Sequence, residues 1–282
     1  MLVALDARSQ GSEHIKQNKP LQDYSYSYTT KNIALVFVAD GHGGEKYIRS
    51  DKGANIACNS AAEVLTRIIN DFLIEIHRHN NNSIKRNHFV EENLKLICSK
   101  ISLEWHKKVL EHFNKNPLSD NEKKMCEDAK ISLPVSDESV SVLYGSTLLA
   151  GFFYKPYNFW FALQIGDGKC ALIKCDNNVT YPIKEDEEQG FGVTKSLCKK
   201  NASEDFRFAF GFEQIEGLVV MTDGMTDSFS LDKLPEFLVN IKNNALKDVE
   251  QTKKELLDFL PTLSEQGSGD DVSLAAFFFK DK

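Results

Sequence analysis

Four apolar runs of strand length each meet an aspartate at one end. Residues 33–39 lead to Asp40, 159–165 to Asp167 and 218–222 to Asp223, and Asp270 with Asp271 precedes residues 272–279. A fifth aspartate, Asp23, precedes tyrosines that alternate with polar residues at 24, 26 and 28. Continuous apolar runs of this length are typical of strands buried on both faces. The chain is therefore expected to fold around buried sheets whose strand ends carry carboxylates.

Each of these aspartates lies close to glycine or another small residue, as in Asp40-Gly41-His42-Gly43-Gly44 and Gly166-Asp167-Gly168. Glycine lets the backbone turn sharply and approach a ligand closely. A lone aspartate at a strand end is commonly a solvated turn residue, but here the pattern repeats. If the strands are neighbours, the carboxylates converge, and they repel one another unless cations neutralise them.

A convergent set of carboxylates predicts a metal site. Oxygen-only ligands favour hard cations, Mg²⁺ or Mn²⁺. Two such ions about 3.5 to 4 Å apart can clamp an in-line displacement at phosphorus. The chemistry that this pattern favours is therefore metal-assisted transfer or hydrolysis of a phosphoryl group.

The rest of the chain predicts helices beside the sheets. Residues 24–28 and 33–39, joined by a short polar link, predict an antiparallel hairpin. Apolar residues at three-to-four spacing predict helices over 57–72, 90–105, 234–243 and 249–260. Further strands are expected at 143–154, 159–165, 170–175, 218–222 and 272–279. This order indicates an α/β (α+β) chain with sheets flanked by helices around one core.

We expect residues 1–282 to form a single domain with an exposed polar insertion around 114–141. That segment contains Pro117 and Pro134 and has no sustained hydrophobic period. A long connection without its own periodicity indicates a surface insertion rather than a linker between domains.

Charge and composition exclude several classes. The chain has 34 Lys and Arg against 41 Asp and Glu, a net charge of −7, and no basic stripe, so nucleic acid is not an expected partner. No apolar run approaches the ~20 residues of a membrane span, and residues 1–6 are too short for a signal-peptide core. Six cysteines form no Cys-x-x-Cys pair and are expected to be reduced. We expect a cytoplasmic protein without membrane contact.

Five motifs in order carry a resemblance to a known family. The segment Val38-Ala39-Asp40-Gly41-His42-Gly43-Gly44 resembles the Asp-Gly-His-Gly-Gly motif of the metal-dependent protein serine/threonine phosphatases of type 2C. The other four follow in the family's order: Tyr144-Gly145-Ser146-Thr147, Gly166-Asp167-Gly168, Thr222-Asp223-Gly224-Met225-Thr226-Asp227 and Gly269-Asp270-Asp271-Val272-Ser273. The resemblance spans about residues 11 to 279 and is strongest to a divergent bacterial branch of the family.

Membership implies a four-layer αββα sandwich, with two central antiparallel sheets flanked by helix pairs. It implies hydrolysis of phosphoserine and phosphothreonine in proteins by a metal-activated water at a dinuclear Mn²⁺ or Mg²⁺ site. The expected partner is a phosphoprotein substrate, and we expect the chain to be a monomer.

The resemblance also implies a role for each metal-site residue. Asp40 would bridge the two metals and Gly41 would offer its backbone carbonyl. Asp223 and Asp270 would complete the coordination of one metal.

Three further roles follow from the same resemblance. Asp23 would reach the metals through bound water, and Asp167 resembles the residue that, with Asp223, holds a looser third metal in some members. His42 matches the histidine proposed to protonate the leaving alkoxide. Catalysis needs such an acid because a serine or threonine alkoxide is a poor leaving group.

The chain departs from the family pattern just before the tyrosine-rich strand expected at 24–28. Many members have Glu-Asp where this chain has Gln22-Asp23, so one negative charge is missing near the second metal. Many also carry an upstream arginine that grips the substrate phosphate, which this chain lacks. His14, Lys16 and Arg8 are the candidates for that contact.

Other hydrolase classes fit less well. A cysteine-based phosphatase needs arginine six positions after its cysteine, and none of the six cysteines has one. Asp40-Gly41-His42 also fits the start of the calcineurin-like metallophosphatases, but their Gly-Asn-His block is missing, as are a P-loop and a Gly-x-Ser-x-Gly elbow. The alternative from another class is a catalytically silent relative that binds a phosphoprotein or a metal as a scaffold.

Overall fold

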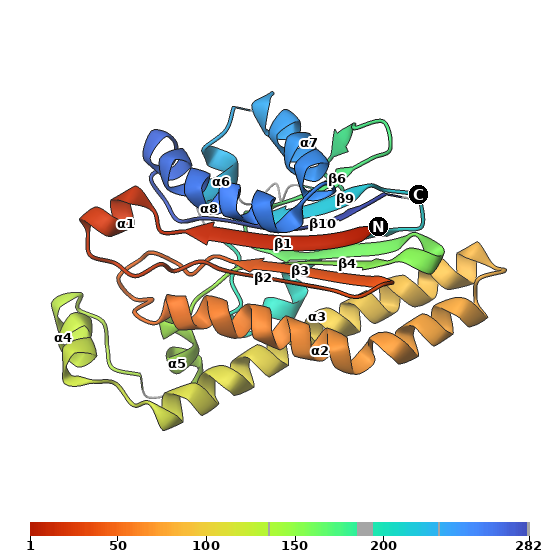
Figure 1. The fold of residues 1–282 in the computed structure, drawn as a ribbon. Coiled ribbons are helices and arrows are strands. Elements are labelled where there is room, and N and C mark those ends of the chain that lie inside the picture. Colours follow the sequence, from red (N-terminus) through yellow and green to blue (C-terminus); the bar gives the residue numbers. More distant parts are fainter. Residues whose placement is uncertain (135, 185–193, 231, 281–282) are drawn as a thin grey trace.

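The computed structural model describes residues 1–134, 136–184, 194–230 and 232–280. Within them, ten strands form two five-stranded sheets in which every paired neighbour is antiparallel (Figure 1). The first sheet runs β1 (Leu2–Ser9), β10 (Val272–Phe279), β9 (Gly217–Met221), β6 (Lys169–Ile173) and β7 (Val179–Thr180). The second runs β2 (Tyr24–Thr29), β3 (Ile33–Ala39), β4 (Leu148–Tyr154), β5 (Phe159–Ile165) and β8 (Arg207–Gly211).

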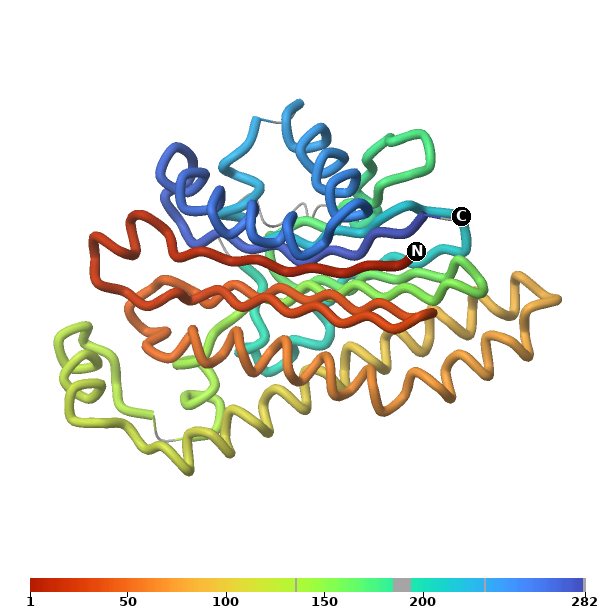
Figure 2. The backbone as a smooth tube through the Cα atoms, viewed as in Figure 1, coloured from red at the N-terminus to blue at the C-terminus, as the bar shows by residue number. Residues whose placement is uncertain are grey.

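Helices cover both outer faces of the paired sheets. The longer ones are α2 (Ser50–Arg78), α3 (Ser83–Lys115), α7 (Lys233–Ala245) and α8 (Val249–Gln266). The shorter ones are α1 (Ser12–Lys16), α4 (Asp120–Asp128), α5 (Asp137–Leu143) and α6 (Asp223–Asp227), with 3₁₀ turns at Lys155–Tyr157 and Ala202–Glu204. Helices α2 and α3 lie against the second sheet, and α7 and α8 lie against the first (Figure 2). The predicted αββα sandwich is confirmed.

The side chains of β3 explain why its sequence is an unbroken apolar run. Leu35 and Phe37 pack toward α2 and α3, whereas Val36 and Val38 pack between the two sheets. Successive side chains of a strand point to opposite faces, so a strand covered on both faces needs apolar residues at every position. Strand β10 follows the same rule between the first sheet's helix layer and the inter-sheet layer.

The four long helices form where the three-to-four spacing predicts them, and each extends beyond the predicted range. In α2, Ala54, Ala57 and Ala61 are fully buried, and such small residues let the helix approach the sheet closely. Asn82 caps α3 by accepting a hydrogen bond from the backbone N–H of Lys85 at 3.0 Å.

The insertion at 114–141 is not without secondary structure, because it contains α4 and α5. Serine begins each helix: Ser119 and Ser136 form capping boxes with Glu122 and Ser139. The helices have nine and seven residues, too short to give a sustained hydrophobic period. The sequence feature that marks these two helices is the serine cap at the start of each rather than a hydrophobic period.

The buried side chain of Arg49 links the insertion to the start of α2. The guanidinium of Arg49 donates to both carboxylate oxygens of Glu122 at 2.6 and 3.0 Å and to the hydroxyl of Tyr144 at 2.8 Å. Its hydrogen bonds hold the pKa of Glu122 at about 2. Because Arg49 follows the Asp40-to-Gly44 loop in sequence, this ion pair joins α4 to the loop's far end.

Two sequence expectations need correction. The strand expected over 143–154 begins at Leu148, because α5 continues to Leu143 and a turn follows it. Strands β1, β7 and β8 and helices α1 and α6 were not expected.

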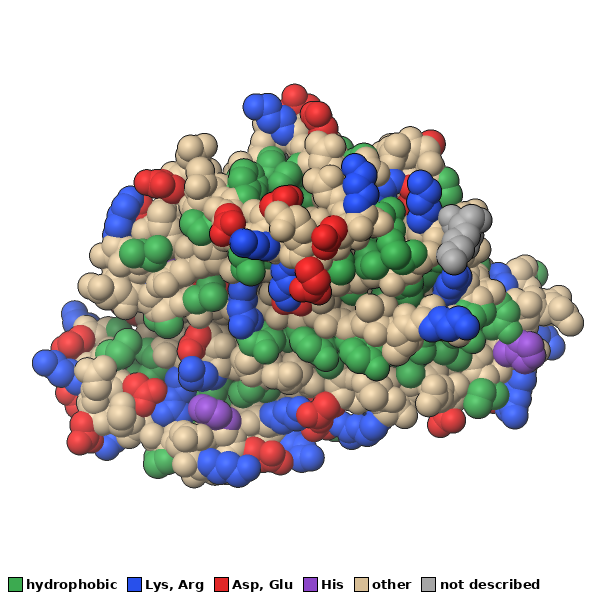
Figure 3. Space-filling view, viewed as in Figure 1, with side chains coloured by type: hydrophobic (Ala, Val, Ile, Leu, Met, Phe, Trp, Pro, Cys, Tyr) green, Lys and Arg blue, Asp and Glu red, His purple; other side chains and the backbone are tan. Residues whose placement is uncertain are grey.

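On the face shown in Figure 3, Lys and Arg are interspersed with Asp and Glu rather than gathered in a stripe. None of the helices formed by the described residues is both long enough and apolar enough to span a membrane.

Candidate active site

The ends of β2 and β3 place two aspartates opposite each other. Tyr24 pairs with Ala39, so Asp23, just before β2, lies across from Asp40, just after β3. The neighbouring strand β4 fixes the backbone of Asp40. Thr147 accepts a hydrogen bond from the Asp40 N–H at its hydroxyl (2.9 Å) and donates its own N–H to the Asp40 carbonyl (2.8 Å).

The first sheet brings further carboxylates to the same region. Strands β9 and β10 are antiparallel neighbours, so Asp223, after β9, lies beside the start of β10, which Asp270 and Asp271 precede. Asp167 lies in the connection that crosses from β5 in one sheet to β6 in the other.

Three of these aspartates form a compact cluster. Asp40, Asp167 and Asp223 each offer a carboxylate oxygen, and these oxygens lie within 4.8 Å of one another. Burial, reinforced by the charges of Asp23, Asp223, Asp270 and Asp167, raises the pKa of Asp40 well above its usual value. Burial and the neighbouring carboxylates raise the pKa of Asp223 to about 7. The cluster is therefore costly when ionised alone, and divalent cations would remove that cost.

Asp23 lies beneath this cluster rather than in it. It is 4% exposed and accepts hydrogen bonds from the hydroxyls of Thr222 (2.9 Å) and Ser273. Burial raises its pKa well above the usual value, and the charge of Asp271 adds to the effect.

The loop after Asp40 is shaped by close backbone contacts. Gly41 forms an isolated bridge with Ser146, and the N–H of His42 donates to the Gly145 carbonyl at 3.1 Å. A Cβ on Gly41 would lie 2.6 Å from the Ser50 carbonyl oxygen. Only glycine fits there without moving the start of α2.

His42 follows directly and faces a cavity. Its ring lies 4.7 Å from the ring of Tyr47, centroid to centroid. Burial lowers the pKa of His42 to about 4; Asp167 opposes this shift, while Lys46 and Lys199 add to it. In the protein alone, His42 is therefore neutral at pH 7.

The two adjacent aspartates before β10 have different surroundings. Asp271 is buried and accepts hydrogen bonds from the backbone N–H groups of Gly11 and Gln22, each at 2.6 Å. The Asp270 side chain is 52% exposed, and its charge raises the pKa of both Asp40 and Asp223. Asp270 therefore lies near enough to the cluster to affect its charges, but its carboxylate groups with His14 and Asp271, whose ligand atoms and its own lie within 4.8 Å of one another. Asp271 holds the segment before β2.

Each of the three candidates for the phosphate contact has a neighbour in the structure, and the buried Nη1 atom of Arg8 has no hydrogen-bond partner among the described residues. The ring nitrogens of His14 lie 3.4 Å from Asp270 and 3.0 Å from Asp271, and the hydrogen bond with Asp271 raises the pKa of His14. Lys16 pairs with Glu13 at the exposed surface. Arg8 places its guanidinium 4.0 Å above the ring of Tyr24. We do not carry Lys16 or Arg8 into the proposed site.

The structure adds residues that the sequence motifs did not indicate. The Lys19 amino group donates to the Gly43 carbonyl at 3.1 Å, and the Thr194 hydroxyl donates to Asp167 Oδ2 at 2.6 Å. Lys46 and Lys199 line the cavity beside His42. Lys19 could have been proposed as a site residue from the sequence, because it lies three residues before Gln22. Nothing in the sequence indicated Thr194 or Lys199, because a long-range contact brings them to the site.

Two buried oxygen atoms near the carboxylate cluster indicate whether the site suits a cation. Asp167 Oδ1 and Gln22 Oε1 have no hydrogen-bond partner among the described residues. The Gln22 amide group donates instead to the Ser50 hydroxyl and, at 3.3 Å, to the His42 carbonyl. An unsatisfied buried acceptor costs about 1–3 kcal/mol. These unpaired oxygens and the oxygen-only donor set fit Mg²⁺ or Mn²⁺.

Several solved structures that share this fold are serine/threonine phosphatases. The S. agalactiae serine/threonine phosphatase is 15% identical, with 99% of this chain and 100% of that chain covered and a TM-score of 0.57. PppA of Pseudomonas aeruginosa is 12% identical over 98% and 97%, with a TM-score of 0.59. The PstP catalytic domain, in complex with two manganese ions, is 14% identical over 99% of both chains, with a TM-score of 0.55. No curated protein matches the sequence significantly.

The sequence also matches a family profile described as Protein phosphatase 2C, over residues 10–261. That range includes Asp23, Asp40, Asp167 and Asp223, and the match covers most of the chain. The chain therefore belongs to the protein phosphatase 2C family of metal-dependent protein phosphatases.

Proposed function

We propose that this chain hydrolyses phosphoserine and phosphothreonine in proteins at a dinuclear metal site built on Asp40. The observation that carries the proposal is the triplet of Asp40, Asp167 and Asp223, whose oxygens lie within 4.8 Å of one another where the two sheets end. Family membership supports the reaction class. The two manganese ions bound to PstP support the number and kind of metal.

Asp40, the Gly41 carbonyl, Asp223 and Asp270 would hold the two ions, which are Mn²⁺ or Mg²⁺. Asp167, with Asp223, would hold a third, looser ion. When bound, the ions supply Lewis acidity toward the phosphate and the attacking water. Asp23 lies beneath the cluster and would reach the metals through bound water. The Thr222 hydroxyl holds its carboxylate in place.

His42 is the chain's own candidate for the general acid. It must carry a proton to give to the leaving alkoxide, yet burial holds its pKa at about 4 in the protein alone. A phosphate dianion in front of the ring favours the imidazolium because opposite charges attract. Substrate binding would therefore bring the acid into its active protonation state.

We expect His42→Ala to reduce hydrolysis of a phosphoserine peptide by about a hundredfold or more, since a positioned acid contributes about 10²- to 10⁴-fold. The loss on p-nitrophenyl phosphate should be at most about tenfold, because p-nitrophenolate leaves without a proton. Steady-state kinetics on both substrates measure the difference, with the exposed His88→Ala as control. Equal losses on the two substrates would remove His42 from the acid role.

We expect Gln22→Glu to lower the Mn²⁺ concentration needed for half-maximal rate by severalfold. The change places a negative charge where the buried Gln22 Oε1 has no partner among the described residues. The control is Gln214→Glu, an exposed change at the far end of the first sheet. A Mn²⁺ requirement that is unchanged or higher in Gln22→Glu would show that this side chain does not act on the metals.

Phosphate release from matched phosphoserine, phosphothreonine and phosphotyrosine peptides tests the proposed function. We expect release from the first two with Mn²⁺ or Mg²⁺, loss of release with EDTA, and recovery when the metal is returned. Release that survives exhaustive chelation contradicts the proposal. Tight phosphopeptide binding with no release under any metal would instead favour the scaffold.

A further inference from the structure

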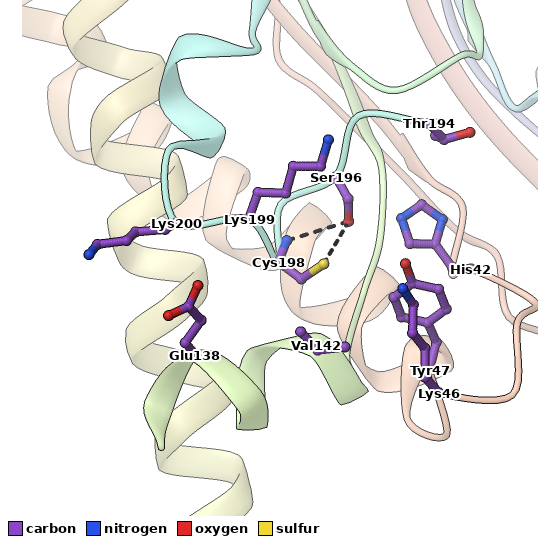
Figure 4. Close-up of a pocket in the computed structure, with 10 residues that line it drawn as sticks. All are labelled: His42, Lys46, Tyr47, Glu138, Val142, Thr194, Ser196, Cys198, Lys199 and Lys200. Atoms are coloured by element: carbon purple, nitrogen blue, oxygen red, sulfur yellow. Dashed lines mark hydrogen bonds between the residues drawn. The ribbon is translucent and has the colours of Figure 1, made fainter. Parts of the chain in front are cut away.

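A cavity of about 620 Å³ opens beside His42. Figure 4 shows Thr194, His42 and Lys46 on one side of it and Cys198, Lys199 and Lys200 on the other, with α5 along a third side. Thr194 lines the cavity and also donates to Asp167 at 2.6 Å. The cavity therefore begins at the carboxylate cluster and extends away from it.

The cavity wall is cationic in a chain whose net charge is −7. Among the described residues, Lys46, Lys199 and Lys200 line it, against the single carboxylate of Glu138. In the described part of the chain, no carboxylate forms an ion pair with Lys46 or Lys199, whereas nearby Lys195 pairs with Asp205 at 3.1 Å. Positive charge on both sides of a cavity favours an anionic occupant.

The cavity continues into a second one and is not a closed phosphate pocket. A neighbouring cavity of about 460 Å³ shares Glu138, Cys198 and Lys200 with it and extends along α3 past Leu103, which is 71% exposed. In Figure 4, Glu138 and Lys200 lie at the end away from His42. The two cavities give a path from the cluster to the surface that suits an extended peptide, which advances about 3.3 Å per residue.

We propose that an acidic side chain flanking the phosphorylated residue of the substrate binds in this cavity, between Lys46 and Lys199. The peptide then leaves over Cys198 toward α3. The inference rests on the proposed function and names its substrate class: phosphoproteins with Asp or Glu close to the phosphorylated residue. Lys46 and Lys199 would select the substrate rather than take part in the chemistry.

The test compares two phosphoserine peptides that differ only in having Glu or Gln at the positions flanking the phosphoserine on both sides. The measured quantity is the ratio of kcat/KM for the Glu peptide to that for the Gln peptide, so a general loss of activity in a variant cancels. We expect a ratio of about ten in the wild-type protein, because each half-exposed charge contact is worth up to about fivefold. In Lys46→Gln/Lys199→Gln the ratio should fall to about one.

The matched control is Lys247→Gln, which removes a positive charge from the exposed connection between α7 and α8 and should keep the wild-type ratio. A wild-type ratio near one, or a high ratio that survives both substitutions, would overturn the inference. If neither peptide is hydrolysed, the proposed function fails, and the ratio of peptide dissociation constants from fluorescence anisotropy then tests the cavity by the same criteria.

Discussion

Asp40→Asn is expected to lower kcat on a phosphoserine peptide by at least about a thousandfold at saturating Mn²⁺. Asp40 would bridge both ions, so the substitution weakens the binding of both ions and disturbs the position of the attacking water. Its backbone position should remain, because Thr147 holds it through main-chain atoms and a hydroxyl. Steady-state kinetics across a Mn²⁺ titration measure the effect.

The stability of the same variant separates lost chemistry from lost folding. Burial and the surrounding carboxylates raise the pKa of Asp40 well above its usual value, so its charge at pH 7 destabilises the metal-free fold relative to the unfolded chain. Asp40→Asn in EDTA should therefore melt at the wild-type temperature or above it, and should gain less from added Mn²⁺. An activity loss below tenfold, or a variant that melts well below wild type in EDTA, would contradict this account of the cluster.

The second large effect is expected at the pair before β10, where two adjacent aspartates should fail in different ways. Asp270→Asn should lose activity by about a hundredfold or more while melting like wild type, because Asp270 would be a direct metal ligand and its side chain is 52% exposed. Asp271→Asn should keep activity within about tenfold when folded but lose about 1–3 kcal/mol of stability. An amide group cannot accept both backbone hydrogen bonds that the Asp271 carboxylate accepts from Gly11 and Gln22.

Kinetics and thermal or urea melts of the two single variants decide between these roles. The control is Asp258→Asn, which removes the same negative charge from an exposed position of α8 on the same side of the fold. The reverse ranking, with Asp271→Asn inactive and Asp270→Asn nearly normal, would mean that the register of this strand start has been misassigned.

The core strands could be predicted because burial on both faces leaves a plain signal. Residues 33–39, 159–165 and 272–279 coincide with β3, β5 and β10. Strand β1 gave no such signal, since Asp6 and Arg8 interrupt its apolar residues. Helix α4 was missed because its evidence was a local cap, the hydrogen bonds between Ser119 and Glu122, rather than a period.

In the candidate site, too, some residues could be predicted from the sequence and others could not. Strand-end carboxylates could be predicted as a group, because antiparallel pairing brings the residues after β3 and before β2 to one edge. The separation of Asp270 from Asp271 followed from strand alternation together with the resemblance. The phosphate contact of His14, Lys16 or Arg8 stays a prediction. Lys16 pairs with Glu13 in its own segment, whereas the contact of Arg8 with Tyr24 depends on the fold. The cavity between Lys46 and Lys199 depends on a contact between segments far apart in the chain.

We propose that the carboxylate cluster built on Asp40 holds two divalent ions. Equilibrium dialysis against micromolar Mn²⁺, followed by elemental analysis of metal and protein, counts the ions directly without relying on activity. The account predicts two Mn²⁺ per wild-type chain and fewer than one in Asp40→Asn, with the exposed Asp258→Asn keeping two. A wild-type chain that binds none, or an Asp40→Asn chain that retains both, would contradict it.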